Sequence, residues 1–382
     1  MIRVLHLFDA TAGWEHRFAV ERLLERLPAS DVEQSVAVVD AAARVRLGLE
    51  SSRCPLFARR FAVGFLHAAP ALRRHLERHR IDILHAWGVQ AAIVAEMAVP
   101  DGSVLVAVTL LDPSVALRNA HFLRTAREPR REPIVCASGT VRQWFVDQGI
   151  DSARCVVIRP GVDFSVIHQA RSSDLRRRLG LNDRQTLVVT PEPVTPTGGH
   201  FAAFWMTAIR SFLEPDIRVA LPGESREQRR LLRLARQIGM DHLVVSPPGE
   251  VRFEQLVAIA DLAVAVPTEE MSGGPLAWAM AAGVPILGTA VYSIAEMIVH
   301  EVNGLLFNPA SAKQLATHLA SALDDRDGLR RLAEVARGQA YQVFGLRRCI
   351  DQHRRLYDNL TSGRSPGDGI TDSAGTVVRQ LC

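Results

Sequence analysis

The chain has 382 residues, 48% of them hydrophobic, and a mean hydropathy of +0.07. This length exceeds one ordinary hydrophobic core and predicts two globular domains. The formal net charge is +4, and Lys313 is the sole lysine, so nearly every cation is an arginine. Because the basic excess is small and no aromatic–basic motif accompanies it, the sequence argues against nucleic-acid binding and favours an arginine-rich solvated surface.

Five scattered cysteines, Cys54, Cys136, Cys155, Cys349 and Cys382, show neither metal-ligand spacing nor a disulfide framework. An odd count in a chain of this length favours reduced thiols. The first residues run directly into an apolar strand, so we expect no signal peptide, and no segment approaches the ~20 apolar residues of a membrane span. We therefore expect a cytoplasmic protein without a structural metal.

The N-terminal half begins with an apolar strand over residues 2–8 and a small-residue loop that contains Gly13. Apolar residues at helical spacing predict a helix over 15–27, and residues 34–39 predict a second strand. Strand, loop, helix and strand in this order open a parallel, doubly wound α/β domain. Further strands are expected at 82–87, 104–110 and 133–138.

Residues 51–80 mix Leu, Phe and Ala with several arginines, which predicts one or two amphipathic helices. A second basic stretch runs from Arg118 to Arg131. Such mixing is typical of a solvated surface, which we favour. Its alternative is peripheral contact of the N-terminal domain with the inner face of a membrane.

The strand–helix pattern restarts after Pro160-Gly-Val-Asp163, so the domain boundary is placed near residue 165. The last helix, to Tyr357, is expected to cross back to the first domain, and the Gly/Ser/Pro-rich tail to be disordered. The predicted segments are 1–165, 166–341, 342–361 (the crossing helix) and 362–382 (the tail). The second-domain strands are predicted at 186–190, 217–221, 243–246 and 262–266, and its helices at 201–212, 226–238, 253–259, 310–323 and 328–344.

The most informative segment follows the apolar run Leu262–Val266. An acidic turn that contains Glu270 ends in Gly273 and Gly274, and a small-residue helix then closes on Gly-Val-Pro285. This order places a carboxylate beside the unpaired backbone N–H groups of a helix N-terminus. Such a place suits hydroxyls and a diphosphate.

This segment resembles the nucleotide-sugar motif of the family-4 glycosyltransferases (glycosyl transferases group 1). There, Pro-Ser-x-x-Glu-Gly-Phe-Gly precedes a second Glu and Ala-Met-Ala-x-Gly-Val-Pro. Pro160-Gly-Val-Asp163 and Asn303–Phe307 match the family too, and the resemblance covers about residues 1–360. It implies the GT-B fold, an α/β architecture of two Rossmann-like doubly wound domains facing across a cleft. The first would lie on the acceptor side and the second on the nucleotide-sugar side.

The resemblance further implies transfer of a hexose, with retention, from a UDP-, GDP- or ADP-sugar to a glycan or lipid acceptor, without a required metal. The family stabilises the leaving diphosphate with an Arg and a Lys after the first strand of the second domain. Laid over that pattern, Glu192 replaces the Arg and Thr197 the Lys, while Gly198 is kept. Each such group typically stabilises the transition state by about 3–4 kcal/mol, so both replacements act against turnover.

Two further positions depart from the family. Trp278 stands where the second Glu would bind ribose hydroxyls, and its indole accepts no hydrogen bond. It would either stack on a base or sugar or fill the vacated pocket, which we favour. On the acceptor side, Gly13 matches the family's glycine loop, while Leu111 occupies the position of a His over the sugar.

Glu270 is retained, and the resemblance gives it contact with the donor sugar's hydroxyls and makes it the candidate catalytic residue. Gly198, Gly273 and Gly274 would bind the donor through their backbone. The alternative for Glu270 is a carboxylate that only stabilises the helix N-terminus. His85 and Trp87, at another strand end, could face the cleft, although a lone His there is more often structural.

Two classes of function therefore remain open. The first is an enzyme in which Arg159, or an Arg from 118–131, supplies the missing cation. The second is a catalytically inactive GT-B pseudo-enzyme that binds a sugar or regulates a partner. An inverting enzyme is less favoured because the sequence offers no clear general base.

Overall fold

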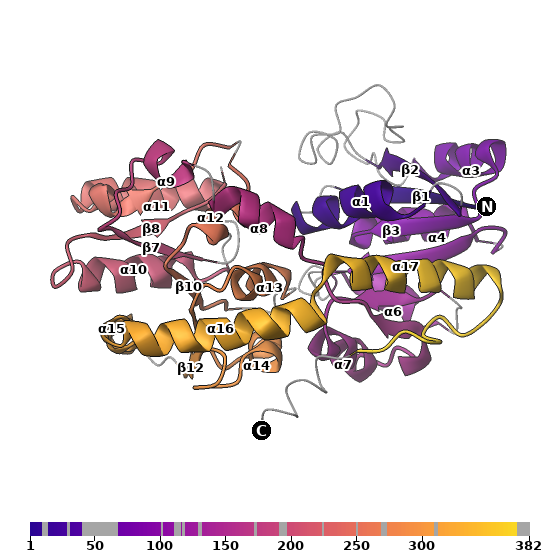
Figure 1. Ribbon diagram of the computed structural model, residues 1–382. Coiled ribbons are helices and arrows are strands. Elements are labelled where there is room, and N and C mark those ends of the chain that lie inside the picture. Colours follow the sequence, from indigo (N-terminus) through magenta and orange to yellow (C-terminus); the bar gives the residue numbers. More distant parts are fainter. Residues whose placement is uncertain are drawn as a thin grey trace. The chain divides into compact units, whose positions relative to one another are not determined.

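Two α/β units make up the described chain (Figure 1). The computed structural model describes residues 1–9, 14–28, 31–39, 68–100, 102–110, 116, 119–128, 132–171, 174–190, 197–223, 225–249, 251–268, 273–308 and 312–372. The first unit comprises residues 1–161 and 346–372, and the second residues 162–345.

The first unit is built on a six-stranded parallel sheet with strand order β2-β1-β3-β4-β5-β6. Its inner strands β3, β4 and β5 are near-continuous apolar runs, as expected when helices cover both faces, whereas the edge strand β2 carries Glu33, Gln34 and Ser35. One face packs against α3, α4, α6 and α7, and the other against α1 and α17. The elements are β1 (Ile2–Phe8), α1 (Trp14–Arg26), β2 (Val32–Val38), α3 (Ala68–His79), β3 (Ile83–Trp87), α4 (Val89–Ala98), β4 (Leu105–Leu110), α6 (Ala120–Ala126), β5 (Ile134–Cys136), α7 (Gly139–Asp147), a 3₁₀ turn (Ser152–Arg154), β6 (Cys155–Val157) and α17 (Leu346–Thr361).

Helix α17 belongs to the first unit although it lies near the end of the chain (Figure 1). A Cβ on Gly161 would lie 2.9 Å from the Cβ of Cys349 and 3.1 Å from the Cα of Leu346. Only a glycine therefore admits the first turn of α17 at this point. The Pro160-Gly161 dipeptide thus has a packing role where the chain leaves the first unit.

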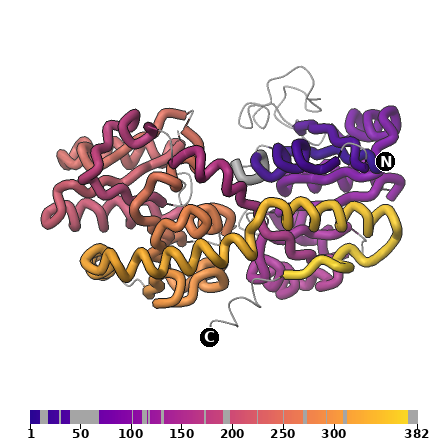
Figure 2. The backbone as a smooth tube through the Cα atoms, viewed as in Figure 1, coloured from indigo at the N-terminus to yellow at the C-terminus, as the bar shows by residue number. Residues whose placement is uncertain are grey.

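The described part of the tail, residues 362–372, folds back along α17, which differs from the disorder expected from its composition (Figure 2). The Asn359 side chain donates to the carbonyls of Pro366 (3.2 Å) and Asp368 (2.9 Å), and Gln352 donates to that of Thr371 (2.9 Å). Polar side chains of α17 thus donate hydrogen bonds to the backbone carbonyls of residues 362–372, a segment that has few apolar residues of its own.

The second unit repeats the architecture with strand order β12-β11-β10-β7-β8-β9, again parallel. Its apolar core lies between the sheet and helices α10, α11 and α15. The elements are α8 (Phe164–Arg171), α9 (Leu175–Arg178), β7 (Thr186–Val189), α10 (His200–Arg210), β8 (Ile217–Ala220), α11 (Arg226–Gln237), a 3₁₀ turn (Asp241–Leu243), β9 (Val244–Val245), α12 (Phe253–Ala258), β10 (Leu262–Ala265), α13 (Gly274–Ala281), β11 (Ile286–Thr289), α14 (Tyr292–Met297), β12 (Leu305–Phe307), α15 (Ala312–Asp324) and α16 (Arg326–Val343).

None of the helices within these described ranges combines the length and the apolar character that crossing a bilayer requires. The predicted amphipathic region 51–80 is described only from residue 68, where α3 begins. Its earlier part lies outside the described residues.

Candidate functional site

Two loops of the second unit meet at the carboxyl edge of its sheet. The backbone N–H of Thr268, after β10, donates to the carbonyl of Thr197, after β7, at 2.7 Å. The Thr268 hydroxyl donates to the same oxygen at 3.2 Å. The loop that carries the altered Arg/Lys pattern and the turn that leads to Glu270 are therefore joined at their flanks.

Close packing fixes the end of the first loop. Gly199, the N-cap of α10, has a φ of 74°, and a Cβ there would lie 2.0 Å from the carbonyl oxygen of Val266. Gly198 beside it is buried. No residue with a side chain fits at position 199, so the backbone of this loop is held against the end of β10.

The N-terminus of α13 has a similar restriction. Gly273, the N-cap, adopts a φ of 75°, and a Cβ there would lie 2.9 Å from the sulfur of Met297. Gly274 is buried at the start of the helix, and Pro275 follows it in the first turn, where backbone N–H groups have no intrahelical acceptor. This arrangement can present backbone donors to an anion.

Trp278 lies inside this helix with 1% of its surface exposed. Its neighbours in α13, from Gly274 to Ala281, are buried as well, and the helix packs against α12 and α16. A ring this enclosed offers no open face to a base, so its burial favours the pocket-filling alternative.

Two buried hydroxyls that we did not predict lie at the same sheet edge. Thr190 directly follows β7 and Thr289 ends β11, the two strands that flank β10. Both are buried, and within the described residues neither hydroxyl has a hydrogen-bond partner. Because a buried hydroxyl is normally paired, both suit a polar ligand. In the sequence, each is marked only by its position as a threonine at the end of an apolar run.

Four predicted site residues, Gly13, Leu111, Glu192 and Glu270, lie outside the described residues. Thr197, Gly198, Gly273, Gly274 and Trp278 are described and all belong to the second unit. Their assignment to a donor site stays a prediction.

His85 and Trp87 lie on the sheet face beneath α17, which supports the structural alternative for His85. His85 is fully buried, its Nε2 lying 2.6 Å from the Thr109 hydroxyl and its Nδ1 2.8 Å from the Tyr357 hydroxyl. Its ring stacks on Trp87, with the two ring centroids 4.4 Å apart. Burial lowers the pKa of His85 well below its usual value, so the ring is neutral.

Two more buried histidines complete this cluster. His6 Nδ1 accepts from the indole N–H of Trp87 at 3.1 Å, which places the proton on Nε2 toward Gln34. His353 Nδ1 donates to the carbonyl of Cys349 at 2.9 Å, which leaves its buried Nε2 without a partner among the described residues. Burial lowers the pKa of both rings to about 4.

Asp9 is a buried carboxylate at the carboxyl edge of the first sheet, and sequence reasoning missed it. It follows β1 directly, and its Oδ2 accepts from the backbone N–H of Ala91 at 2.8 Å, in the first turn of α4. A Cβ on Gly88 would lie 2.6 Å from the same oxygen. This packing gives Asp9 a helix-capping role.

Of the proposed substitute cations in the described residues, Arg159 and Arg127 are engaged in internal contacts, whereas Arg124 is exposed, with one guanidinium nitrogen 3.3 Å from His121 Nδ1. Arg159 is 6% exposed, and two of its guanidinium nitrogens donate to Asp372 at 2.7 and 2.9 Å. Arg127 donates to the carbonyl of Gln148 at 2.6 Å. Neither guanidinium is available to a diphosphate in this arrangement, whereas Arg118, Arg130 and Arg131 lie outside the described residues.

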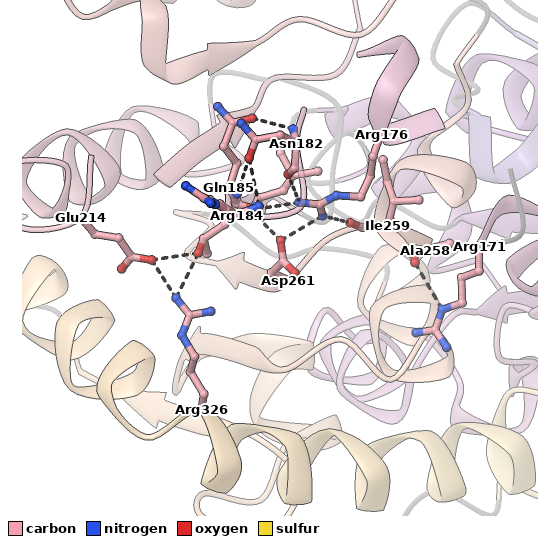
Figure 3. Close-up of polar contacts among 12 residues, drawn as sticks. Arg171, Arg176, Asn182, Arg184, Gln185, Glu214, Ala258, Ile259, Asp261 and Arg326 are labelled. Atoms are coloured by element: carbon pink, nitrogen blue, oxygen red, sulfur yellow. Dashed lines mark hydrogen bonds and ion pairs between the residues drawn. The ribbon is translucent and has the colours of Figure 1, made fainter. Parts of the chain in front are cut away.

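Arginines also hold the base of the second sheet (Figure 3). Arg176 donates to the carbonyls of Ile259 (2.8 Å) and Gln185 (2.6 Å) and to the carboxylate of Asp261 (3.0 Å). Arg326 donates to Glu214 at 2.7 Å. These contacts lie at the amino ends of the strands, so these arginines are structural.

A pocket of about 740 Å³ also lies in the second unit, lined by residues of β12, α15 and α16. Its wall includes His300, Phe307 and His318 but none of the predicted site residues. The volume is sufficient for a ligand, but the pocket lies along the edge strand β12 and is lined by no described residue of the loops that follow β7 and β10.

Two parallel α/β units of this topology define the GT-B class of folds. The structure of HepE from Anabaena, solved in complex with UDP-glucose, is similar over 95% of this chain and 100% of that one, with a TM-score of 0.77 and 19% identity. The family model "Glycosyltransferase Family 4" matches residues 18–166, and "Glycosyl transferases group 1" matches residues 173–339. The chain therefore belongs to the family-4 glycosyltransferases (glycosyl transferases group 1), and the resemblance seen in the sequence is confirmed.

Named relatives match shorter stretches. The N-acetyl-alpha-D-glucosaminyl L-malate synthase of Bacillus anthracis is 28% identical over 144 residues, 38% of this chain and 38% of the relative. A D-inositol 3-phosphate glycosyltransferase of Xylanimonas cellulosilytica is 32% identical over 209 residues, 52% of this chain and 49% of the relative. The matched part of the chain thus spans less than half the length of these relatives.

Proposed function

We propose that the protein is a retaining glycosyltransferase that transfers a hexose from a nucleotide sugar to a glycan or lipid acceptor. The observation that supports this most is the junction of the two loops at Thr197 and Thr268, beside a helix N-terminus and two buried hydroxyls that have no partner within the described ranges. A diphosphate fits the backbone donors of α13, and sugar hydroxyls fit Glu270, Thr190 and Thr289. The division into an acceptor-side first unit and a donor-side second unit belongs to the same proposal.

The experiment is a thermal-shift panel with UDP, GDP, ADP and their common sugars. It compares the wild type with Glu270→Ala. The control variant is Glu269→Ala, which removes a carboxylate one position earlier. We expect one nucleotide sugar to raise the melting temperature of the wild type and of Glu269→Ala but not of Glu270→Ala. No shift with any nucleotide would contradict a working donor site.

Transfer assays with the identified donor then test the acceptor. The panel comprises oligosaccharides and lipids, together with L-malate and inositol 3-phosphate, the acceptors that the names of two relatives contain. Nuclear magnetic resonance of the product reads the anomeric configuration, and inversion of it would contradict the retaining mechanism.

A second candidate, a non-catalytic GT-B protein that binds a sugar or a partner, is favoured by the loss of leaving-group cations. Glu192 and Thr197 replace them, and Arg159 is held by Asp372. The double variant Glu192→Arg with Thr197→Lys separates the two candidates. If the protein is an enzyme whose leaving-group cations come from elsewhere in the chain, the double variant should gain little activity. If it is a pseudo-enzyme that binds the donor, the variant should gain turnover, since each restored cation raises the rate by roughly 10²–10³-fold.

A further inference from the structure

Helix α10 of the second unit exposes a row of large apolar side chains. Trp205, Ile209, Phe212 and Leu213 recur at helical spacing over α10 and the turn that follows it, and we call them the α10 stripe. Phe212 and Leu213 are 76% and 79% exposed. Isolated exposed apolar residues are ordinary, but four on one face form a patch of the kind that marks an interaction site.

The neighbouring helix α11 presents a basic face. Its five arginines, Arg226, Arg229, Arg230, Arg233 and Arg236, are all exposed. They lie within one third of the helical circumference, opposite the buried Leu231 and Ala235. Among the described residues, no ion pair involves Arg226, Arg230, Arg233 or Arg236.

The stripe and the basic face belong to one surface. Phe204 of α10 packs with Leu231 and Ala235 of α11 against β8, so the two helices cover the same face of the sheet. The guanidinium of Arg230 lies 5.7 Å from the ring centroid of Phe201, one helical turn before Trp205. Apolar side chains and cations are therefore continuous across this surface.

The acidic residues next to the stripe are themselves neutralised. Glu214 pairs with Arg210 at 3.3 Å and with Arg326 at 2.7 Å, and Asp324 pairs with Arg210 at 2.8 Å. The field of α11 at the stripe is thus not cancelled by these carboxylates, although Asp216 and Asp241 also lie exposed nearby in sequence.

We propose that the α10 stripe and the arginines of α11 dock the second unit on an anionic phospholipid bilayer. Aromatic and aliphatic side chains enter the headgroup–acyl boundary, and arginines beside them contact phosphates while their stems lie along apolar surface. The α10 stripe belongs to the second unit, whereas residues 51–80 belong to the first, and docking through the stripe does not depend on the proposed donor chemistry.

Charge and side-chain type decide against two other occupants. A two-fold contact between the stripes of two copies would bring two five-arginine faces together, which like-charge repulsion opposes. Single-stranded nucleic acid would use stacked aromatic rings, whereas Ile209 and Leu213 offer only aliphatic surface. A bilayer accepts both the aliphatic side chains and the arginines.

The test is co-sedimentation of the full chain with vesicles of phosphatidylcholine alone or of equal phosphatidylcholine and phosphatidylglycerol. We expect binding to the anionic vesicles that weakens with salt. Phe212→Ser with Leu213→Ser should reduce the partition coefficient at least ~10-fold. Arg230→Gln with Arg233→Gln should reduce it about 25-fold, since each arginine near the surface contributes about 5-fold.

The control variants remove one exposed aromatic side chain or two exposed arginines elsewhere in the same unit. Tyr341→Ser replaces an aromatic side chain that is 71% exposed, and Arg330→Gln with Arg331→Gln removes two exposed charges from α16. Both should bind like the wild type. Brominated lipid should quench tryptophan emission in the wild type and less in Trp205→Phe.

The proposal is overturned if the wild type does not bind anionic vesicles. It is equally overturned if the control variants lose as much vesicle binding as the variants of the α10 stripe and of α11. It is also overturned if the wild type self-associates in sedimentation velocity and Phe212→Ser with Leu213→Ser abolishes that association, which would assign the stripe to a second copy. If polyuridylate displaces the wild-type protein from vesicles, and if its binding to the protein is lost in Trp205→Phe, the surface would be assigned to nucleic acid.

Discussion

Tyr357 and His85 are 272 residues apart in the sequence, yet the Tyr357 hydroxyl lies 2.8 Å from His85 Nδ1. The contact joins α17 to the centre of the first sheet, and a further hydrogen bond joins His85 to Thr109 on the next strand. The end of the chain thus contributes to the core of the domain that begins it.

We expect Tyr357→Phe to destabilise the protein by about 1–3 kcal/mol, because it leaves a buried ring nitrogen of His85 without its partner. Denaturant unfolding of the first unit measures the change. Tyr341→Phe, at an exposed site, is the control and should be neutral. Equal stability of the two variants would show that the Tyr357 contact contributes nothing.

The buried histidines predict that stability falls as the pH is lowered. Burial lowers the pKa of His6 and His353 from 6.5 to about 4, so the unfolded chain binds protons more readily than the folded one. With respect to these two groups, the free energy of unfolding is therefore at its highest above about pH 7, and it declines as the pH falls through 6.5 toward 4. By pH 5 each histidine should lower it by about 2 kcal/mol.

His353→Asn tests this dependence, because an amide keeps a donor toward the Cys349 carbonyl but does not titrate. Urea unfolding at pH 7 and pH 5 should show a smaller decrease for His353→Asn than for the wild type. His242→Asn, which alters an exposed side chain, should retain the full decrease. An unchanged slope in His353→Asn would exclude His353 as a source of the pH dependence.

Gly199→Ala should be among the most destabilising alanine substitutions in the second unit. The new Cβ would lie 2.0 Å from the Val266 carbonyl oxygen, and the residue would also have to keep a φ of 74°. Gly239→Ala has a similar φ of 70° but nothing within 4 Å of its Cβ, so it isolates the backbone strain of about 1–2 kcal/mol. Thermal unfolding of both should show the larger loss for Gly199→Ala, and equal losses would refute the close packing of the two loops.

Thr190→Val separates a ligand-binding role from a structural one. Valine has the same shape and removes a buried hydroxyl that has no partner among the described residues, so stability should be retained or rise by about 1 kcal/mol. Binding of the nucleotide sugar should weaken about tenfold if that hydroxyl contacts it. Thermal melts give the stability, and calorimetric titration of the same preparation gives the affinity. The control is Thr207→Val, which removes a buried hydroxyl that donates to the Ala203 carbonyl at 2.9 Å in the wild type. Full affinity in Thr190→Val would remove Thr190 from the site.

Local signals predicted most of the fold. Local chemistry sets the start of α7, where the Ser138 hydroxyl accepts from the Val141 N–H at 3.1 Å as the N-cap. Apolar runs located β1, β3, β4, β7 and β10 to within two residues. The strand β11 and the helix α4 were not predicted, because Ile-Leu-Gly-Thr is short and α4 is apolar on all sides, which leaves no periodicity to detect.

The remaining features depend on contacts between distant parts of the chain. The composition of residues 362–372 suggests disorder, but Asn359 and Arg159 supply the polar partners that order them. The sequence motif singles out Gly198, Gly273 and Gly274 as predicted donor-binding residues, because close backbone packing restricts the residue type at such positions. Thr190 and Thr289 carry no motif, and only the strand order β11-β10-β7 places them beside the same edge.

Hydrogen exchange read by mass spectrometry, with and without the nucleotide sugar that the thermal panel selects, tests whether the donor binds at the carboxyl edge of the second sheet. We expect protection at residues 197–200, 266–268, 273–278 and 289–293, the described segments at the carboxyl edge of the second sheet. Protection confined instead to the pocket lined by His300, Phe307 and His318, or no protection in the second unit, would contradict donor binding at that edge.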